Sequence, residues 1–427
     1  MIGVIADDVT GATDVAAAFR EVGLTTLLAF GVPRVDSEPI EKWDAVVVAL
    51  KSRSVPRDDA IELSLTALEW LRGAGAERFY FKYCSTFDST ARGNIGPVTE
   101  AISNRLGSAV VVTTPSSPSH GRTVYQGHLF VGSTLLAESH MRHHPVNPMK
   151  DSSVLRLLAA QSTSPPALLD LNAVRNGSER VRAAINEAAR AGTKQIVADA
   201  TSDEDLTVIG QALGEATFAA GAAGLARGVA LSWIGARGRS APPSPSSGPA
   251  AILAGSCSTR TLEQIGAYVT GYPSRLYRLD SSGHPDAVAM SNAALDWYDR
   301  LEPGPPPLIY SSLPPAELRE VQDRLGAGEA SDLFEEAAAL IGSGLAERGI
   351  SQLIVAGGET SGAVVAALDL GVVEVGKDAA VGVPWVIARD RKLALALKSG
   401  NFGGRDFFVE FARGHADTEN DEVGEHE

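Results

Sequence analysis

A glycine-rich turn with the sequence GGETSG occupies residues 357–362, between the apolar runs 353–356 and 363–368. This order predicts a buried strand, a tight turn and the start of a helix. Glycine lets the backbone approach a ligand closely, and the first N–H groups of a helix have no partner within it. The unit therefore suits an anion such as phosphate, with a simple strand-to-helix turn as the structural alternative. It is not a Walker A loop, because no Lys follows the last glycine.

The residues of this turn that could contact a phosphate are Gly357, Gly358, Glu359, Thr360, Ser361 and Gly362. Thr360 and Ser361 could instead cap the helix. Two further turns of similar composition follow predicted strands. GSCS at 255–258 precedes a predicted helix, where Ser256 or Ser258 could contact a nucleotide or act as a cap. KSGNFGG at 398–404 contains Lys398, whose charge could neutralise a phosphate.

Paired carboxylates, Asp7 and Asp8, follow the short apolar run 2–6 at the start of the chain. The carboxyl ends of strands are where α/β sheets usually bind ligands. The pair could hold Mg²⁺ through water, or one carboxylate could accept a proton. The structural alternative is an N-cap for the helix expected over 12–22, with Asp14 in its first turn favouring the helix dipole.

The densest polar stretch is KYCSTFDSTARGN at 82–94, which follows one predicted strand and precedes a predicted helix. Its hydroxyls, its carboxylate Asp88 and its cations Lys82 and Arg92 could bind a small polyhydroxylated acid, with Arg92 clamping the carboxylate. A polar surface loop is the alternative, although Cys84 and Phe87 among these groups fit a cleft better.

A second candidate lip of the same site lies at 121–131, where Arg122 and Tyr125 are the residues of interest. His120 and His128 are potential ligands or acids, although an isolated His is more often structural. Asp199, at the tip of a predicted strand, could join the site or cap a turn. Zinc is rejected for the histidines of 140–144, because the chain has no suitable Cys pair and no HExxH motif.

The elements that must position these residues alternate between strand-like and helical patterns. Strands are expected at 26–30, 45–50, 78–82 and 109–113, with helices at 58–72 and 97–106 between them. Such alternation predicts an α/β fold with mostly parallel sheets. The Ala- and Gly-rich segment 216–233 is expected to form one closely packed helix, and 385–388 and 393–397 to form paired strands.

Two domains are expected from the length of 427 residues. The Pro-, Ser- and Gly-rich segment 238–249 is the predicted linker. It separates an N-terminal domain, 1–237, from a C-terminal domain, 250–413, with a cleft between them. Residues 414–427 are acidic and are expected to form a disordered tail.

A net charge of −15 argues against a nucleic-acid-binding surface, which should be basic. The two cysteines, Cys84 and Cys257, imply no disulfide framework. No window of the sequence reaches the length of a membrane span, and the start of the chain lacks the pattern of a secretory signal. A cytoplasmic location is therefore expected, without nucleic-acid or membrane partners.

The chain resembles the four-carbon acid sugar kinases. The resemblance runs from residue 2 to about 411 and rests on long motifs: ADDVTGATD at 6–14, KYCSTFDSTARGNIGP at 82–97, GRTVYQGHLFVG at 121–132, MRHHP at 141–145, GSCS at 255–258, GGETSG at 357–362 and KSGNFGG at 398–404. It implies an N-terminal domain that binds the sugar acid and a C-terminal domain that binds ATP. The ATP contacts that it implies are Ser258, the run Thr360 to Ala363, and Gly403.

The expected activity is ATP-dependent phosphorylation of the 4-hydroxyl of a four-carbon sugar acid, with Mg²⁺ bridging the phosphates; the metal ligands are unknown. 3-Oxo-tetronate is the first expectation for the substrate, and D-threonate and D-erythronate are alternatives. The residues expected to contact the sugar acid are Thr10, Gly11, Lys82, Ser85, Thr86, Asp88, Ser89, Arg92, Asn94, Arg122 and Tyr125.

Asp8 is the first candidate for the catalytic base, with Asp7 or Asp88 as alternatives, and catalysis would consist mainly of positioning and charge neutralisation. The expected partners are the sugar acid and ATP, and a homodimer is an open alternative. A non-catalytic sensor of nucleotide and sugar acid is a competing function. An NAD-dependent oxidoreductase is disfavoured, because GxGxxG follows neither first strand.

Overall fold

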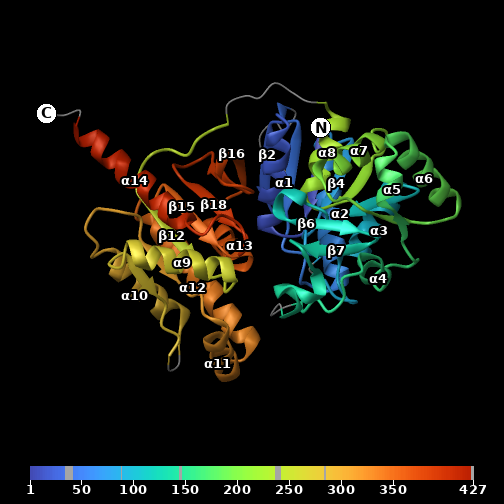
Figure 1. Cartoon of the computed structure of the whole chain (residues 1–427). Helices are drawn as coiled ribbons and strands as arrows, with labels where there is room; N and C mark the ends of the chain where they lie inside the picture. Colours follow the sequence, from blue (N-terminus) through green and yellow to red (C-terminus); the bar gives the residue numbers. More distant parts are fainter. Residues whose placement is uncertain (34–41, 88, 144–146, 236–241, 283–284, 425–427) are drawn as a thin grey trace. The chain divides into compact units, whose positions relative to one another are not determined.

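The structure is a computed structural model that describes residues 1–33, 42–87, 89–143, 147–235, 242–282 and 285–424, with side chains described up to residue 415. The chain divides into two compact units, Met1–Ala241 and Pro242–Glu427, each of which is described by itself. Figure 1 shows both with their labelled elements. Residues 238–241 of the predicted linker lie outside the described residues. The predicted cleft concerns the relative placement of the domains and stays a prediction.

Unit 1 is built on a parallel sheet with the strand order β2-β3-β1-β4-β11-β5-β10-β9. The strands of this sheet are β1 (Ile2–Ala6), β2 (Thr26–Phe30), β3 (Ala45–Ala49), β4 (Arg78–Lys82), β5 (Val111–Thr114), β9 (Ala167–Leu169), β10 (Gln195–Ala198) and β11 (Phe218–Gly221). A separate antiparallel sheet consists of β6 (Arg122–Tyr125), β7 (His128–Val131) and β8 (Thr134–Leu135). The central strands are buried along their whole length, as expected for a sheet covered on both faces.

Helices connect the parallel strands of unit 1. They are α1 (Val9–Glu21), α2 (Arg57–Gly73), α3 (Ile95–Leu106), α4 (Val154–Ala159), α5 (Leu171–Arg175), α6 (Ser178–Arg190), α7 (Asp203–Ala212) and α8 (Ala223–Trp233). Short 3₁₀ turns lie at Pro118–His120, Leu136–Glu138 and His140–His143. Helices α1 and α7 each pack against α8, whereas α2 packs against α3.

The connections of unit 1 reverse direction between two neighbouring strands. From β1 the chain passes through α1 to β2 at one edge of the sheet, whereas from β4 it passes through α3 to β5 on the other side. Because such crossovers are right-handed, the two helices lie on opposite faces of the sheet. The carboxyl ends of β1 and β4 are therefore the topological switch point of this sheet, the usual position of a ligand in an α/β fold.

Unit 2 has a mixed sheet with the order β13-β14-β12-β15-β18-β17-β16. Its strands are β12 (Ala250–Ala254), β13 (Leu276–Arg278), β14 (Leu308–Tyr310), β15 (Gln352–Ala356), β16 (Val372–Ala380), β17 (Val383–Ala388) and β18 (Ala394–Lys398). Strands β13, β14, β12, β15 and β18, which are neighbours in this order, are parallel to one another. Strand β17 pairs antiparallel with both β18 and β16. The mostly parallel α/β fold predicted from the sequence is confirmed.

The helices of unit 2 place a second reversal between β12 and β15. They are α9 (Thr259–Gly271), α10 (Ala287–Tyr298), α11 (Pro315–Leu325), α12 (Ala327–Glu347), α13 (Gly358–Leu368) and α14 (Phe407–Gly424). From β12 the chain passes through α9 to β13 at one edge, and from β15 it passes through α13 to β16 at the other. The carboxyl ends of β12 and β15 are thus the topological switch point of this sheet, where the same rule expects a ligand.

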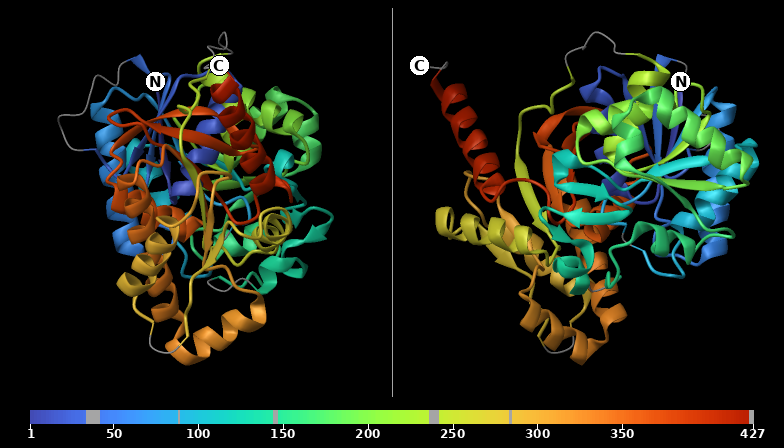
Figure 2. Two further views of the ribbon diagram at one scale, coloured as in Figure 1. Left: turned by 90° about the vertical axis from the view of Figure 1, so that its left-hand side faces the viewer. Right: turned by 45° about the vertical axis from the view of Figure 1, so that its right-hand side comes forward.

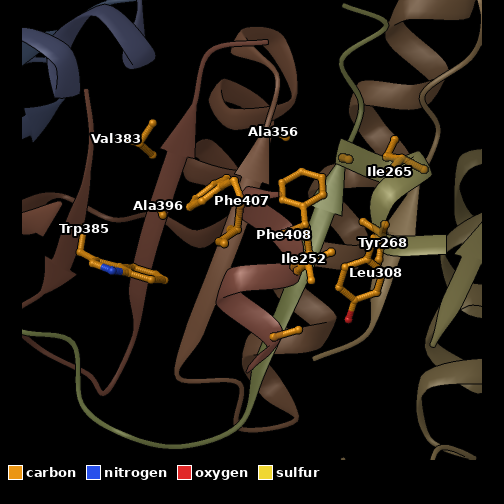
Figure 3. Close-up of a cluster of buried hydrophobic side chains, with 14 of the residues drawn as sticks. Ile252, Ile265, Tyr268, Leu308, Ala356, Val383, Trp385, Ala396, Phe407 and Phe408 are labelled. Carbon is orange, nitrogen blue, oxygen red and sulfur yellow. The ribbon is translucent and has the colours of Figure 1, made fainter. Parts of the chain in front are cut away.

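A core cluster fastens α9 and α14 to one face of the unit 2 sheet. Phe407 and Phe408 of α14 pack among Ile252 of β12, Tyr268 of α9 and Trp385 of β17, all of which are nearly inaccessible to solvent (Figure 3). This packing anchors the start of α14, and therefore also the turn at 399–404 that precedes it.

Two expectations about local structure are wrong. Residues 216–233 form β11 and α8 rather than one helix, because a short apolar run can be a buried strand or a helix and its periodicity does not decide between them. Helix α1 begins at Val9, so that Asp14 lies in its second turn. Helix α14 continues into the acidic segment as far as Gly424 and runs out from the rest of unit 2 (Figure 2), while the expected disorder of residues 414–427 stays a prediction.

Candidate functional site

The candidate site of unit 1 is a charged cluster at the carboxyl ends of β1 and β4, which we call the β1–β4 cluster. Asp7 follows β1, and its backbone N–H donates to the carbonyl of Lys82, the last residue of β4, at 3.0 Å. The parallel pairing of Ala6 with Lys82 thus brings the two predicted polar segments together. The members of the cluster are Asp7, Asp8, Asp14, Arg53, Lys82, Cys84, His120 and Arg122.

Arg53 joins the two aspartates. Its guanidinium donates to both carboxylate oxygens of Asp7, at 3.0 and 2.8 Å, and lies 3.0 Å from Oδ1 of Asp8. Arg53 comes from the loop after β3, and the side-chain amide of Asn94 holds that loop by donating to the carbonyls of Ser52, Arg53 and Val55. Asn94, predicted to contact the substrate, is therefore used to position Arg53.

Asp8 is the N-cap of α1. Its Oδ1 accepts from the N–H of Gly11 at 2.7 Å, and its Oδ2 accepts from the hydroxyl of Thr10 at 3.0 Å. Burial tends to raise the pKa of Asp8, but Arg53, Lys82 and these donors together hold it below the usual value. Burial raises the pKa of Asp7, and Arg53 offsets only part of this effect. The two adjacent carboxylates thus differ in their acidity.

A second group of charges surrounds Asp14. The Nζ of Lys82 lies 3.6 Å from Oδ2 of Asp14, and Nδ1 of His120 lies 3.9 Å from Oδ1. Arg122 donates from Nη1 to the carbonyl of His120 and lies near Cys84 and Asp14. Burial lowers the pKa of Arg122, and its buried Nε has no hydrogen-bond partner among the described residues. A buried guanidinium with a spare donor is suited to an anionic ligand.

The other residues predicted to contact the sugar acid differ in their burial and in their distance from the β1–β4 cluster. Ser85 and Thr86 are buried beside Cys84, and Ser89 accepts a hydrogen bond from Gln161 at 2.9 Å. Arg92 is exposed, and its predicted clamp on a carboxylate stays a prediction. Asp88 lies outside the described residues. Tyr125 is 46% exposed, and its hydroxyl is 3.5 Å from Nε2 of the neighbouring Gln126; within the described chain it does not join the β1–β4 cluster.

Asp199 and His128 stabilise the turn between β6 and β7. Asp199 accepts from the N–H groups of Gln126 and Gly127, both at 2.8 Å, where the backbone of both residues has positive φ. Nδ1 of His128 lies 2.8 Å from the carbonyl of Gln126. Both residues therefore have the structural roles that the sequence analysis kept as alternatives.

The described residues contain no group of three or more His, Cys, Asp or Glu side chains that could hold a metal ion. The oxygens of Asp7 and Asp8 already accept hydrogen bonds from Arg53, Gly11 and Thr10. A direct bond from Mg²⁺ to Asp7 or Asp8 would have to compete with these donors.

The candidate site of unit 2 consists of the turns that follow β12, β15 and β18. The N–H of Gly357 donates to the carbonyl of Lys398 at 2.8 Å, and the N–H of Ser256 donates to the carbonyl of Ala356 at 3.1 Å. A Cβ on Gly357 would lie 3.1 Å from the backbone nitrogen of Ser256, and one on Gly400 would lie 2.9 Å from Oγ of Ser258. Glycine is required at both positions because the turns touch.

The residues predicted to contact phosphate have different surroundings in this structure. Gly358 and Glu359 are exposed at the start of α13, whose N-cap position is Gly357, without a side-chain cap. Ser361 is buried, and its hydroxyl donates to the carbonyl of Val355 at 3.4 Å, away from the helix end. Ser258 caps α9 by accepting from the N–H of Thr261 at 3.3 Å.

Thr360, Gly362, Ala363 and Gly403 remain candidates for phosphate contact. Thr360 is buried beside Gly357, with its Oγ1 positioned 2.9 Å from where a Cβ on that glycine would be. Gly362 and Ala363 are partly exposed along the first turns of α13, and Gly403 has the positive φ of a tight turn.

Lys398 lies at the end of β18 and is fully buried. Its Nζ donates to the carbonyl of Gly400 at 2.7 Å, to that of Ser399 at 3.0 Å and to Oγ1 of Thr261 at 3.1 Å. These three bonds occupy the three donors of its ammonium group, and the expectation that its charge neutralises a phosphate stays a prediction. Burial, reinforced by the charge of Arg260, lowers the pKa of Lys398 to about 7.

Sequence reasoning missed three polar residues of these sites. Arg53 follows β3, a neighbour of β1, so a search for charges at the ends of adjacent strands would have found it. Gln161 donates to Ser89 and to the carbonyl of Thr90, and accepts from the N–H of Gly96. Gln264 holds the turn after β18. Neither glutamine lies in a motif that points to its contacts.

Among the described residues, no helix is both apolar and long enough to cross a lipid bilayer. Comparison with family models gives two matches. A sugar-binding N-terminal domain matches residues 2–229, and a nucleotide-binding C-terminal domain matches residues 251–408.

Curated relatives match along nearly their whole length. A 3-oxo-tetronate kinase of Methylobacterium radiotolerans is 45% identical, over 95% of this chain and 97% of its own. One of Salmonella typhimurium is 43% identical, over 96% and 98%. A solved structure from Salmonella typhimurium LT2 is 41% identical with a TM-score of 0.84, over 97% of this chain and 99% of its own. Another, from Haemophilus influenzae, is 39% identical with a TM-score of 0.74, over 96% and 99%.

Proposed function

The chain belongs to the 3-oxo-tetronate kinase family, and from this premise we propose that it phosphorylates the 4-hydroxyl of 3-oxo-tetronate with ATP. The observation that carries the proposal is the likeness to these kinases over nearly the full chain, which includes the polar segments of both candidate sites. In the transfer, the 4-hydroxyl oxygen forms a bond to the γ-phosphorus, and the bond between that phosphorus and the bridging oxygen breaks. The products are 3-oxo-tetronate 4-phosphate and ADP.

Unit 1 binds the sugar acid in this proposal. Arg122 receives the substrate carboxylate, because its buried guanidinium has a spare donor at Nε. Asp8 accepts a hydrogen bond from the 4-hydroxyl and takes its proton, while Arg53 keeps both aspartates in place. The low pKa of Asp8 suits a loose transition state, in which positioning contributes more than strong base catalysis.

Unit 2 binds ATP, with the phosphates on the turns after β12, β15 and β18. Exposed backbone at the start of α13 and the close packing of glycines allow the backbone to reach the phosphate oxygens. Mg²⁺ would be held mainly by the phosphates of the nucleotide, because the described residues do not form a protein-built metal site. No step of the proposal depends on a protein ligand to Mg²⁺.

D-threonate and D-erythronate are the alternative substrates, since they share the carboxylate and the terminal hydroxyl. Both cysteines are free thiols, which supports the proposed reducing, cytoplasmic location. A homodimer remains a prediction that light scattering would test.

The first test is ADP release with Mg·ATP and a panel of 3-oxo-tetronate, D-threonate, L-threonate and D-erythronate. We expect release only with 3-oxo-tetronate. Faster release with a threonate or erythronate would keep the kinase and overturn the substrate. Nucleotide binding without release on any of the four acids would favour the non-catalytic sensor.

A further inference from the structure

The turn at 399–404 is held from the inside by three buried side chains. Lys398 donates to the carbonyls of Ser399 and Gly400, and Thr261 donates to that of Gly400 at 2.9 Å. Gln264 donates from Nε2 to the carbonyl of Phe402 at 3.1 Å and to that of Gly404 at 2.8 Å. Most carbonyl groups of the turn are thus directed toward α9 and the interior of unit 2.

The direction of these carbonyls determines where the amide groups point. In a trans peptide, the N–H of one residue points opposite to the C=O of the residue before it, and the described chain has no cis peptide bond. The carbonyls of Ser399, Gly400 and Phe402 face inward. The N–H groups of Gly400, Asn401 and Gly403 therefore face away from Lys398 and Gln264.

Successive N–H groups on one side of a turn form a concave site for anions. Gly400 lies against Ser256 and Ser258 of the turn after β12, so this amide face borders the neighbouring phosphate-binding turn. The ammonium group of Lys398 adds a positive charge behind it. Since Lys398 is fully buried, that charge acts through a poorly solvated interior rather than through water.

We infer that Gln264 and Lys398 are positioning residues for nucleotide binding: they hold the carbonyls of the 399–404 turn inward, so that its amide face binds the phosphates. This inference rests on the proposed function of unit 2. It replaces direct phosphate contact by Lys398 with an indirect role, and it assigns a function to Gln264, which lies outside the recognised motifs. Oε1 of Gln264 is buried without a partner among the described residues, so the amide contacts its surroundings through the two hydrogen bonds that Nε2 donates to the turn.

The test is Gln264→Met, which keeps the length of the side chain and removes its donor. The matched control is Gln352→Met. Gln352 is also buried and also donates to a backbone carbonyl, that of Ser246 at 2.8 Å, but it lies at the amino end of β15, the opposite edge of the same sheet. Both variants lose buried hydrogen bonds to the backbone, but only the bonds of Gln264 hold a turn of the proposed nucleotide site.

ADP affinity is measured by calorimetry, the KM values for ATP and sugar acid by ADP release, and stability by thermal unfolding. We expect Gln264→Met to weaken ADP binding and raise the ATP KM on the order of tenfold, as the loss of one or two hydrogen bonds predicts. The sugar-acid KM should not change, and Gln352→Met should leave both nucleotide values unchanged. Equal nucleotide effects in both variants would overturn the inference, because they would indicate loss of stability alone.

Lys398→Met gives a second route if Gln264→Met does not fold. Met fills the same space without a buried charge, so we expect a folded protein with at least tenfold weaker ADP binding. Unchanged ADP affinity in whichever variant folds would overturn the inference while leaving the proposed kinase intact. Absence of ADP binding by the wild type would instead overturn the proposed function of unit 2, and the inference with it.

Discussion

Two buried cations of this protein have opposite surroundings. Arg53 lies between the carboxylates of Asp7 and Asp8, and these charges raise its pKa well above the usual value in spite of its burial. The hydrogen bonds of Lys398 go to neutral oxygens, and burial lowers its pKa to about 7. Arg53 therefore stays charged at neutral pH, whereas the pKa of Lys398 lies near neutrality.

This difference predicts a pH dependence of nucleotide binding. An anion bound near Lys398 favours its protonated form, so ADP binding should raise its pKa and take up a fraction of a proton between pH 7 and 8. ADP affinity of the wild type should fall as the pH rises through this range. Calorimetry in buffers of different ionisation enthalpy measures the uptake, and Lys398→Met should lack the wild-type excess. Equal proton uptake in both proteins would contradict the prediction.

The effect of Lys398 on stability has the opposite sign. Its pKa is about 7 in the folded protein and 10.5 as the reference for an unfolded chain. Between these values the unfolded state binds more protons, so the contribution of Lys398 to the free energy of unfolding increases with pH. Nucleotide binding and stability should therefore respond to this one lysine in opposite directions.

At the scale of elements, helix α1 depends on the same carboxylate that we propose as the catalytic base. Asp8 accepts the N–H of Gly11 as the N-cap of α1, and the loop after β3 supplies Arg53 to hold that carboxylate. A cap and a base make different demands, because capping needs an oxygen acceptor and proton transfer needs a carboxylate.

Asp8→Asn should separate the two roles. Asn is as good an N-cap as Asp, so thermal stability and ADP affinity should persist, while kcat should fall by about 10²–10⁴. Asp8→Ala should lose the cap as well and reduce stability by about 1 kcal/mol. The control is Asp286→Asn, since Asp286 caps α10 in unit 2 and should tolerate the change. Near-normal turnover of Asp8→Asn would exclude Asp8 as the base.

At the scale of the whole molecule, the two candidate sites belong to different compact units of the chain. Residues of the β1–β4 cluster come from unit 1, and the turns after β12, β15 and β18 come from unit 2. Each site lies at the reversal of connections in its own sheet. The two ligands should therefore bind through separate sets of residues, although turnover requires both.

Variants of one unit should therefore leave the ligand of the other unit bound. We expect Arg122→Met to lose sugar-acid binding and to keep wild-type ADP affinity by calorimetry. Conversely, 3-oxo-tetronate should still protect Cys84 from iodoacetamide in Gln264→Met, because Cys84 lies in the β1–β4 cluster. Cys257 in unit 2 serves as the internal reference for alkylation. Loss of ADP affinity in Arg122→Met would contradict this independence.

Much of the fold could be predicted from local patterns. Strands β1, β2 and β4 have the predicted bounds, because short apolar runs between turn residues are a local property. The expected helix over 216–233 is wrong for β11, because the local pattern does not show that β4 and β5 lie on both sides of this segment and pair with it. The polar segments that follow the strands could also be recognised, because side-chain types are read directly from the sequence.

The sequence by itself determined the alternating α/β pattern, the glycine-rich turns and the stock of polar groups, because each depends on residues close together in the chain. Only the tertiary structure decided how these groups are paired. It placed Arg53 between Asp7 and Asp8, turned Lys398 into the interior and set Gln264 behind the 399–404 turn. The contacts of Arg53 with Asp7, of Lys398 with Thr261 and of Gln264 with Gly404 join residues far apart in sequence. They depend on strand order and burial, which no local pattern specifies.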